Sequence, residues 1–486
     1  MSVPLLARPA VGAWFSLRTA GQASSATPST CSSRARILPY ASLEAGGGPL
    51  VTRPVCSIIQ RRPASPTATT LPPGPVCPPV FAPSAAILAM PDNFGEKTVC
   101  EFFAGIGLVH EALQSSGWRC LYAGDIDPKK HAMHAGHYGA SDHFHEGDIW
   151  DADEVLARIA EPPFLATASF PCTDMSLAGK RRGLAGAQSG ALFGFLQVIE
   201  QLADRRPRMV LLENVPGFLT SHGGKDFEVA AQELADLGYW LDAFLIDARW
   251  FVPQSRPRMF VVGYHESIIG PPLVVRRENA EWFALDDRWQ QAVHASDKMR
   301  PVNLLRAIQS IELPTGWATV ETGCPPQRRY ELADFLDADD DQPWWDQQQC
   351  DRHAAMMFDR HRQQVDALVD DPRGVTLLTA FRRVRQGEQR MEVRFDGVAG
   401  CLRTPRGGSA KQIVLRAGRG RLDMRWMTPR EYARLQGAPD YTLPDNTIQA
   451  LFGFGDAVCV PAIRWIDEQM LTPVWQAAAK SLLPSP

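Results

Sequence analysis

Between Lys97 and about residue 264, the apolar positions show two different kinds of spacing. Apolar runs of about four to eight residues bounded by turn residues are typical of buried strands, whereas apolar residues three or four apart are typical of helices. A strand pattern followed by a helix pattern recurs through this region, which predicts an α/β fold with a doubly wound, mostly parallel sheet. The expected strands are Thr98–Phe103, Cys120–Asp125, a weaker one near Phe144, Phe164–Phe170 and Met209–Leu212, followed by candidate antiparallel edge strands at Phe244–Ile246 and Met259–Gly263.

The alternation of strand and helix patterns is lost on both sides of this region. Residues 1–89 are rich in Pro, Ser, Ala and Thr and show neither period, which predicts a disordered extension or a mis-assigned start. Their Arg- and Ser-rich, acid-poor composition is also compatible with a transit peptide. After about residue 270, tryptophans, prolines and an acidic run at Asp337–Asp341 replace the repetition, so we expect a separate, smaller and irregular module. Helical patterns return at Pro429–Gln436 and Asp456–Met470.

Composition adds limits rather than a function. No apolar stretch approaches the roughly 18 residues that a membrane helix needs. The ten cysteines form no C-x-x-C pair and no His/Cys cluster at zinc spacing, which favours a reduced, cytoplasmic protein without a metal. The net charge is −4, and residues 1–89 hold seven arginines and one acid, so removing their +6 leaves −10 on the remainder. Any contact with nucleic acid must therefore come from local basic patches.

A glycine loop between the first strand and its helix is the first candidate site. Phe103-Ala-Gly-Ile-Gly-Leu108 would let a ligand approach the backbone closely. His110 stands where a dinucleotide fingerprint needs its third glycine, so the loop favours a nucleoside joined to a small charged group over a pyrophosphate. Asp125 ends the second strand and could grip a ribose hydroxyl, and Asp148 ends the third and could accept from an adenine amino group. A tight structural turn and helix-capping acids are the alternative interpretation.

A thiol and a carboxyl group follow two later strands. Pro171-Cys172 comes after the run ending at Phe170, and Glu213 comes after the run ending at Leu212. In an open α/β sheet, chemistry collects just beyond the carboxyl ends of the strands, so both groups can face one substrate. A buried inert cysteine is the usual alternative. The pair predicts covalent catalysis with acid assistance, in which Glu213 donates a proton or hydrogen bond to a ring nitrogen.

Basic residues surround this pair along the chain. Residues 176–190 are rich in glycine and include Lys180-Arg-Arg182, which suits a loop that closes over an anionic polymer and raises the thiolate fraction of the cysteine. In Gln254-Ser-Arg-Pro-Arg258, Arg256 and Arg258 are two residues apart and share one face of an extended segment. Two guanidinium groups there suit a base carbonyl and phosphate oxygens.

These elements together resemble those of the DNA (cytosine-5) methyltransferases. The resemblance spans about residues 97–264 and 397–470, and its order is that of the bacterial restriction–modification type. It implies a class I, Rossmann-like, S-adenosylmethionine-dependent fold, with a catalytic domain at 90–270, a target-recognition domain at 271–412, and a C-terminal part at 413–486 that returns to the catalytic domain. The motifs that carry it are Phe103–Gly107, Pro171-Cys172, Glu213-Asn-Val215, Gln254-x-Arg256-x-Arg258 and Arg406-Gly-Gly-Ser409.

The resemblance also implies roles for these residues. Cys172 would add to carbon-6 of a flipped cytosine and Glu213 would support ring nitrogen 3. Arg258 would contact the base carbonyl and Arg256 would organise the catalytic loop. A closing helix near Gly455–Val458 would pack against the first strand–loop. The residues implied to bind S-adenosylmethionine are Phe103, Gly105, Gly107, Asp125 (ribose), Asp148 (adenine) and Pro171. Those implied to bind DNA are Ser176, Lys180, Arg181, Gln254, Arg406, Gly407, Gly408 and Ser409.

Three residues depart from the family pattern: Leu108 replaces a glycine, Thr173 replaces a frequent glutamine, and Asp456 stands where asparagine is usual. The implied partner is double-stranded DNA, and the implied setting is a monomer in a bacterial cytoplasm, with no metal or membrane and with a cognate restriction endonuclease encoded nearby. Two alternatives remain: an RNA (transfer-RNA) cytosine-5 methyltransferase and a catalytically silent DNA-binding regulator. A Rossmann oxidoreductase leaves the Pro-Cys and Glu-Asn-Val elements unexplained.

Overall fold

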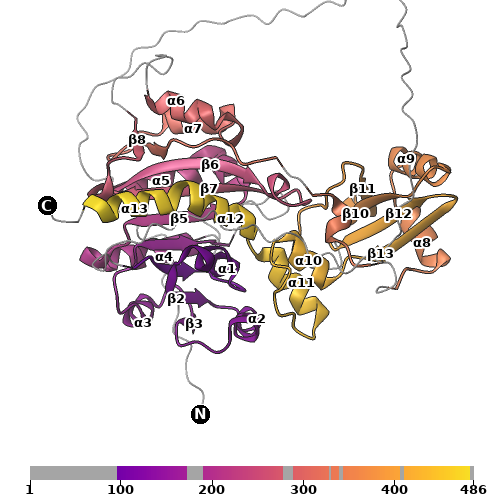
Figure 1. Ribbon diagram of the computed structural model, residues 1–486, viewed down its shortest axis with the longest axis horizontal. Helices are drawn as coiled ribbons and strands as arrows, with labels where there is room; N and C mark the ends of the chain where they lie inside the picture. Colours follow the sequence, from indigo (N-terminus) through magenta and orange to yellow (C-terminus); the bar gives the residue numbers. More distant parts are fainter. Residues whose placement is uncertain are drawn as a thin grey trace, which may run out of the picture. The chain divides into compact units, whose positions relative to one another are not determined.

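The computed structural model describes residues 96–171, 190–276, 288–327, 330–338, 343–405 and 410–481. Its main sheet has the strand order β3-β2-β1-β4-β5-β7-β6 (Figure 1). The first five strands of that order pair in parallel, while β7 is antiparallel to both β5 and β6. The expected doubly wound sheet with antiparallel edge strands is thus confirmed. The strands are β1 (Thr98–Phe102), β2 (Arg119–Asp125), β3 (Phe144–Glu146), β4 (Leu165–Ala168), β5 (Met209–Asn214), β6 (Tyr239–Asp247) and β7 (Pro257–His265).

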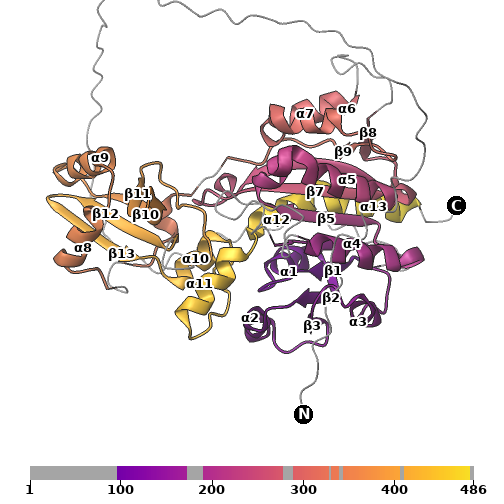
Figure 2. The same cartoon turned by 180° about the vertical axis from the view of Figure 1, so that it is seen from behind.

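Both faces of the main sheet are covered by helices. Alternate residues of β1 point to opposite faces, so Val99 joins the hydrophobic cluster that contains residues of α1 and α12, while Phe102 joins the cluster that contains residues of α3, α4 and α5. Helices α12 and α13 lie in front of the sheet in Figure 1, and α4 and α5 lie in front of it in Figure 2. These helices are α1 (Leu108–Leu113), α2 (Pro128–Tyr138), α3 (Ala152–Arg158), α4 (Ala191–Gln201), α5 (Lys225–Asp236), α12 (Val460–Ile466) and α13 (Thr472–Ser481).

The central strands are buried along their whole length. All residues of β4 and β5 are buried, which is why both read as continuous apolar runs rather than as alternating ones. Strand β5 extends two residues beyond the predicted end, so Glu213 and Asn214 belong to the strand itself. Glu213 is opposite Phe260 of β7, whereas the pairing of β5 with β4 ends one residue earlier, at Leu212.

The segment after residue 270 packs first against the main sheet. Strands β8 (Leu273–Val275) and β9 (Ala318–Val320) pair antiparallel, and Trp289 and Leu304, from helices α6 (Arg288–Ala295) and α7 (Val302–Ser310), belong to the same cluster as α4 and α5.

A buried ion pair anchors this segment to the main sheet. Arg300 and Asp242 of β6 are 2% and 4% exposed, and the guanidinium lies 2.8 and 2.7 Å from the two carboxylate oxygens. The hydroxyl of Thr319 also donates to Asp242 at 2.6 Å. A charge at this depth is tolerated because its partner and hydrogen bonds replace water.

We expect Arg300→Ala to lower the free energy of unfolding by about 3–5 kcal/mol, because it leaves the Asp242 carboxylate buried without its counter-charge. Denaturant unfolding measures the loss. Arg288→Ala is the matched control, because the Arg288–Glu321 pair is exposed and should contribute less than about 1 kcal/mol. Equal losses in the two variants would show that the buried pair is not an anchor.

A second sheet has the order β11-β10-β12-β13 and is antiparallel throughout. Together with α8 and α9 it encloses a hydrophobic cluster of its own, which includes Val365, Met391 and Leu415. The expected smaller domain is therefore present as a regular sheet, and its strands run past the expected boundary at residue 412. Its elements are α8 (Gln347–Ala354), α9 (Asp359–Val369), β10 (Thr376–Arg385), β11 (Glu388–Arg394), β12 (Gln412–Gly418) and β13 (Arg421–Trp426).

The C-terminal helices differ in part from the sequence pattern. Helix α10 (Pro429–Leu435) matches its prediction and begins with a capping box between Thr428 and Glu431. The helix predicted from Asp456 begins later, because Asp456 is the last residue of α11 (Thr447–Asp456) and the chain is extended at Ala457. Among the described helices, none is both long and apolar enough to span a membrane.

Candidate active site

The predicted site residues gather at one edge of the main sheet. The loop Phe103–Gly107, Asp125, Asp148, Pro171 and Glu213 lie at or just after the carboxyl ends of β1 to β5. These strands are parallel neighbours in the order β3-β2-β1-β4-β5, so their carboxyl ends meet at the same edge. The sheet thus places the nucleoside-type residues beside the carboxyl group, as the sequence predicts.

The glycine loop is shaped by its backbone. Phe103, Gly105 and Gly107 have φ angles of 57°, 61° and 83°, in the left-handed region that glycine adopts without strain. One carboxylate oxygen of Asp125 accepts the Gly105 N–H at 2.9 Å, and the other accepts the Asp127 N–H at 2.9 Å. Asp125 therefore fastens the loop after β1 to the end of β2, and its remaining lone pairs are available for a ligand hydroxyl.

Two tyrosines hold the same loop from behind. The hydroxyl of Tyr138 on α2 donates to the Gly107 carbonyl at 2.8 Å. The hydroxyl of Tyr441 lies 2.8 Å from the Ile106 carbonyl and 3.0 Å from the Met133 carbonyl. Both tyrosines come from segments that the motif pattern does not single out, so only the tertiary structure shows that they support the loop.

Gly107 leaves no room for a side chain. A Cβ at this position would lie 2.7 Å from ring atoms of His134 and of Tyr138. The glycine is therefore required both by its backbone angle and by the close approach of α2.

We expect Gly107→Ala to weaken donor binding by tenfold or more and to destabilise the fold, because α2 must shift to make room for the new methyl group. Calorimetric titration and thermal unfolding measure the two effects. Gly117→Ala is the control, since Gly117 has a φ of 84° but open space around its Cβ position. That variant carries only the backbone strain, about 1–2 kcal/mol. Identical behaviour of the two variants would exclude a packing requirement at Gly107.

The end of α11 closes over the glycine loop. A Cβ at Gly453 would lie 2.8 Å from Met133 and 2.9 Å from Ile106, so the helix backbone is in close contact with the loop and with α2. Lys130 lies 3.8 Å from Asp125 and 3.6 Å from Asp456. The acid that replaces the usual asparagine thus pairs with a lysine of α2. The helix that packs on the first strand–loop is α11, which ends at Asp456, and not a helix that begins there as expected.

Asp148 also has a local partner. It follows β3, is partly exposed, and accepts the Trp150 N–H at 3.2 Å. Asp125 and Asp148 each accept the backbone amide two residues further on, but neither caps a helix, because the N-caps of α2 and α3 are Asp127 and Asp151. Both lie at the carboxyl edge of the sheet, as the binding interpretation requires.

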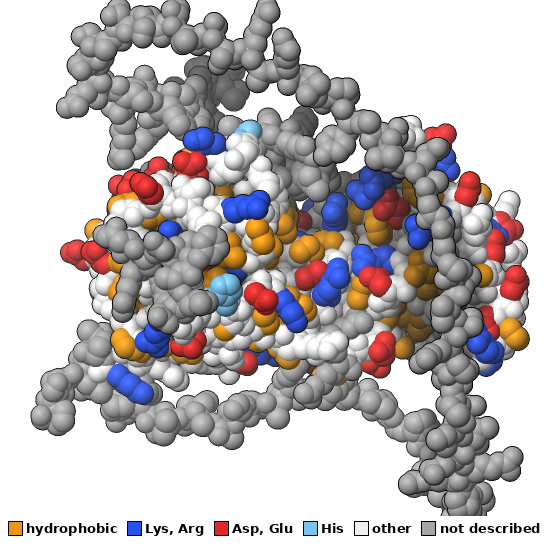
Figure 3. Space-filling model, turned by 90° about the horizontal axis from the view of Figure 1, so that it is seen from above, with side chains coloured by type: hydrophobic (Ala, Val, Ile, Leu, Met, Phe, Trp, Pro, Cys, Tyr) orange, Lys and Arg blue, Asp and Glu red, His pale blue; other side chains and the backbone are white. Residues whose placement is uncertain are grey.

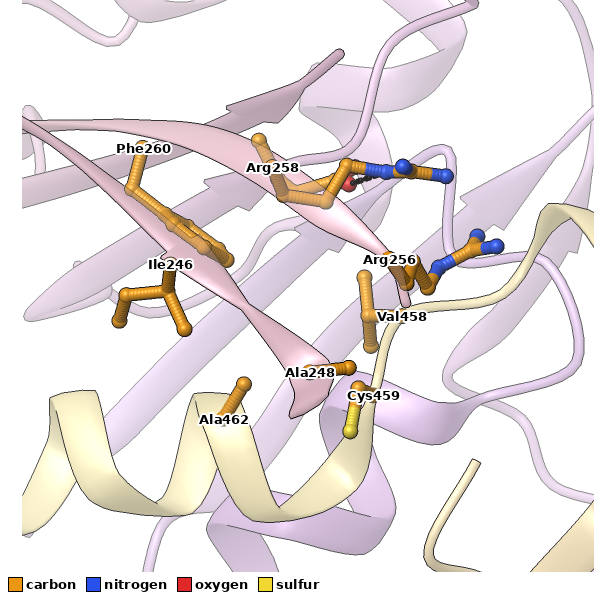
Figure 4. A pocket seen from close by; sticks show the side chains of 9 residues that line it. Ile246, Ala248, Arg256, Arg258, Phe260, Val458, Cys459 and Ala462 are labelled. Atoms are coloured by element: carbon orange, nitrogen blue, oxygen red, sulfur yellow. Dashed lines mark ion pairs between the residues drawn. The ribbon is translucent and has the colours of Figure 1, made fainter. Parts of the chain in front are cut away.

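Glu213 and Arg258 form the polar centre of the neighbouring pocket. The Arg258 Nε lies 2.7 Å from the Glu213 carboxylate, and their side chains are 15% and 11% exposed. A cavity of about 10 Å³, close to the size of one water molecule, lies beside them (Figure 4). It is lined by Glu213, Ile246, Ala248, Arg256, Arg258, Phe260, Val458, Cys459 and Ala462.

Asn214 joins the two strand ends that carry the thiol and the acid. Its side-chain amide donates to the Phe170 carbonyl at 3.1 Å, and its oxygen accepts the Val215 N–H at 2.8 Å. Phe170 is two residues before Cys172, so this bond joins the chain just before the cysteine to the end of β5. The sequence analysis assigns Asn214 no role, although it directly follows Glu213 in the motif.

Gln254 and Arg256 take internal partners in the structure. Gln254 was expected to bind DNA, but its side chain is fully buried and contacts the backbone of Leu435 and Leu402. Arg256 is 2% exposed, and it donates to the carbonyls of Leu402 and Gly455 at 2.8 and 3.3 Å and to that of Ala457. Gln254 therefore joins the segment before β7 to Leu402 and to the end of α10, and Arg256 joins it to Leu402 and to the chain at Gly455–Ala457.

A second thiol lies close to this pair. Cys401 is 3.6 Å from a nitrogen of Arg256 and 3.9 Å from one of Arg258. Burial acts to raise the pKa of this thiol, but the guanidinium groups of Arg258 and Arg256 outweigh it and lower the pKa below its ordinary value. Cys401 was not predicted as a site residue, because it belongs to none of the quoted motifs and only the tertiary structure brings it to Arg256 and Arg258.

Several predicted residues lie outside the described part of the chain. They are Cys172, Ser176, Lys180, Arg181, Arg406, Gly407, Gly408 and Ser409. Pro171 is described and is partly exposed directly after β4. The catalytic-loop contacts expected of Arg256 also fall in the undescribed stretch 172–189.

Comparisons with known proteins identify the family of this chain. The family model for C-5 cytosine-specific DNA methylases matches residues 97–472. The type II methyltransferase M.HpaII of Haemophilus parainfluenzae is 26% identical over 389 residues, which cover 78% of this chain and 90% of that enzyme. The type II methyltransferase M.BsuFI of Bacillus subtilis is 32% identical over 183 residues, which cover 36% of this chain and 41% of that enzyme. The Dnmt2 methyltransferase of S. pombe superposes with a TM-score of 0.45 at 17% identity, over 78% of this chain and 98% of that chain.

The family match begins at Lys97, just before β1, and ends in the first turn of α13. It therefore includes every strand of both sheets and every strand end at which a candidate site residue lies. The chain belongs to the C-5 cytosine-specific DNA methylase family and is a DNA (cytosine-5) methyltransferase.

Proposed function

We propose that the protein transfers a methyl group from S-adenosylmethionine to carbon-5 of a flipped cytosine in a specific double-stranded DNA sequence. The observation that carries this proposal is the junction of β4 and β5. There the Asn214–Phe170 hydrogen bond and the Glu213–Arg258 ion pair place a carboxyl group beside the chain that leads to Cys172. Two strands away lies the glycine loop that Asp125 fastens.

The residues present fit the donor. The left-handed loop leaves Gly105 partly exposed, with its N–H bonded to the Asp125 carboxylate, while Gly107 is buried against α2. Lys130 lies between Asp125 and Asp456, which offsets part of the negative charge there. When bound, S-adenosylmethionine supplies an electrophilic methyl group. Asp125 would hold the ribose hydroxyls and Asp148 would accept from the adenine amino group.

Cys172 and Glu213 would carry out the chemistry on the cytosine. The Cys172 thiolate would add to carbon-6 of cytosine, and the displaced electron pair would raise the electron density at carbon-5. Glu213 would stabilise the charge that develops at ring nitrogen 3 by donating a hydrogen bond or a proton. After carbon-5 takes the methyl group, loss of the carbon-5 proton to a base would expel the cysteine. The product is 5-methylcytosine, with no bond to the enzyme.

Arg258 holds the acid in place for this step. Its Nε bonds Glu213 at 2.7 Å, and in the proposed complex its guanidinium would also contact the base carbonyl. The target base must leave the helix, because carbon-6 is shielded when the bases are stacked. The small cavity beside Glu213 is far below the volume of a base, so it is not itself the site of the flipped cytosine.

The second sheet is the proposed reader of the DNA sequence. Its β10–β11 hairpin carries Arg382, Arg383, Arg385, Arg390 and Arg394. Acidic side chains lie among them, as in the Arg385–Glu392 pair at 2.9 Å. Basic and acidic side chains are interspersed over the face in Figure 3 as well. Binding would therefore rest on specific local contacts, and the hairpin arginines would make it fall with rising salt.

Protection of DNA against a cognate restriction endonuclease is the proposed biological role, because M.HpaII and M.BsuFI are type II methyltransferases. Mapping of 5-methylcytosine in the DNA of cells that express the protein tests function and specificity together. We expect methylation within one short sequence, and endonucleases that cut this sequence should then be blocked.

Two further measurements, methylation of transfer RNA and DNA binding by the purified protein, separate the alternatives. Methylation of transfer RNA without methylation of DNA would establish the RNA enzyme. Binding of DNA by the purified protein without any methyl transfer to DNA or RNA would establish the silent regulator.

A further inference from the structure

A buried polar cluster lies beneath the donor loop and has no part in the chemistry above. Glu101 on β1 is 1% exposed, and neither of its carboxylate oxygens has a hydrogen-bond partner among the described residues. The Nδ1 of His110 on α1 lies 3.6 Å from one of them. With the Cys120 thiol at the start of β2, these groups place three ligand atoms within 4.8 Å of one another.

The carboxylate is under-compensated for its burial. A contact of 3.6 Å is longer than a hydrogen bond, so His110 does not replace the water that Glu101 loses on folding. A buried carboxylate normally takes direct hydrogen bonds, a close counter-ion or a metal. Cys120 is not a donor to it, because its thiol points to the Tyr122 carbonyl at 3.4 Å. A cation at the centre of the three groups would satisfy the carboxylate.

We propose that Glu101, His110 and Cys120 form a binding site for a divalent transition-metal ion of the zinc type. Thiolate and imidazole ligands select zinc-like ions over magnesium and calcium, which prefer oxygen ligands alone. Zinc–ligand bonds of about 2.0–2.3 Å put tetrahedral ligand atoms about 3.3–3.8 Å apart, so the side chains would draw inward by about 1 Å. Three protein ligands leave the fourth position to water.

The positions of the three groups in the fold indicate what a bound ion would do. Glu101 is two residues before Phe103, His110 is three residues after Gly107, and Cys120 is the second residue of the strand that ends at Asp125. The ion would therefore fasten together β1, α1 and β2, the three elements that carry the donor loop. Its binding energy would add to the stability of that region, because the unfolded chain has no preformed site.

Cobalt substitution of the full-length protein tests the proposal. After chelator treatment, the protein is titrated with Co²⁺ alone, and we expect about one equivalent to produce tetrahedral d–d bands and a near-ultraviolet thiolate-to-cobalt band. Cys120→Ser should remove the thiolate band, and Glu101→Gln and His110→Gln should each weaken binding by tenfold or more. Cys100→Ser is the control, because Cys100 lies on β1, directly before Glu101, but its side chain belongs to the hydrophobic cluster on the opposite face of the sheet; it should keep the band.

Two further measurements keep the proposal open to refutation. Zinc-edge X-ray absorption of the wild-type protein should give one sulfur and two or three nitrogen or oxygen neighbours, a result that does not depend on any variant folding. Zn²⁺ should also raise the melting temperature of wild type but not of Glu101→Gln. A thiolate band that survives in Cys120→Ser, an absorption spectrum without sulfur, or no retained metal would each overturn the site.

Discussion

Cys172→Ala is expected to abolish methyl transfer while DNA binding stays measurable. The thiolate is the group that would form the bond to carbon-6, and alanine offers no substitute nucleophile. Most of the DNA affinity comes from contacts with the phosphates and bases elsewhere, so it does not depend on this bond. Transfer of labelled methyl groups and a DNA gel-shift assay measure the two properties on the same preparation.

Cys401 makes this test sharper. It lies beside Arg256 and Arg258, whose guanidinium groups outweigh burial and lower its pKa, whereas burial raises the pKa of Cys459, the thiol that lines the cavity beside Glu213. Cys401→Ala should keep methyl transfer and should keep the covalent adduct with DNA that contains 5-fluorocytosine. Full turnover by Cys172→Ala, or loss of the adduct only in Cys401→Ala, would refute the assignment of Cys172.

Glu213→Gln is expected to slow methyl transfer by about 10²–10⁴-fold, the range typical for loss of a general acid. Glutamine preserves the size of the side chain but cannot supply a proton to ring nitrogen 3. The change also breaks the charge pairing with Arg258, whose Nε is 2.7 Å from the carboxylate. Donor affinity should be nearly unchanged, because the glycine loop and Asp125 belong to other strands.

Single-turnover kinetics and calorimetric titration of the donor separate these effects. Asp226→Asn is a suitable control, since Asp226 is another buried acid after β5 but pairs with His222 instead of an arginine at the strand end. It should leave the single-turnover rate close to that of wild type. Parallel losses of rate and donor affinity in Glu213→Gln would mean that Glu213 maintains the fold of the site and is not its acid.

Much of the main sheet could be predicted from the sequence, because strand and helix periods are local properties. The predicted apolar runs Phe164–Phe170 and Met209–Leu212 became the buried central strands Leu165–Ala168 and Met209–Asn214. Chemical groups placed just after such runs must lie at the same edge when the strands are parallel. The predicted positions of Asp125, Pro171 and Glu213 at that edge follow from this rule.

The second sheet was harder to anticipate. Its strands pair across a long stretch of chain, with Phe381 opposite both Glu392 and Gln412. No repeating spacing of apolar residues indicates such pairings, so the segment was predicted to be irregular. Helix α11 was missed for a related reason, since its two glycines lower helix propensity but are needed where the helix touches Ile106 and the Arg403–Thr404 backbone.

Sequence alone thus determined the fold class, the family and the order of the chemical groups along the chain, because these depend on local periodicity and on motif spacing. The tertiary structure determined which buried polar groups have hydrogen-bond or ion-pair partners, and which residues are those partners. It buried Gln254 and Arg256 against distant backbone, joined Tyr441 to Ile106, and brought Glu101, His110 and Cys120 together without enough hydrogen bonds. Such contacts join residues far apart in the chain, and they form only when elements with unrelated local patterns pack against each other.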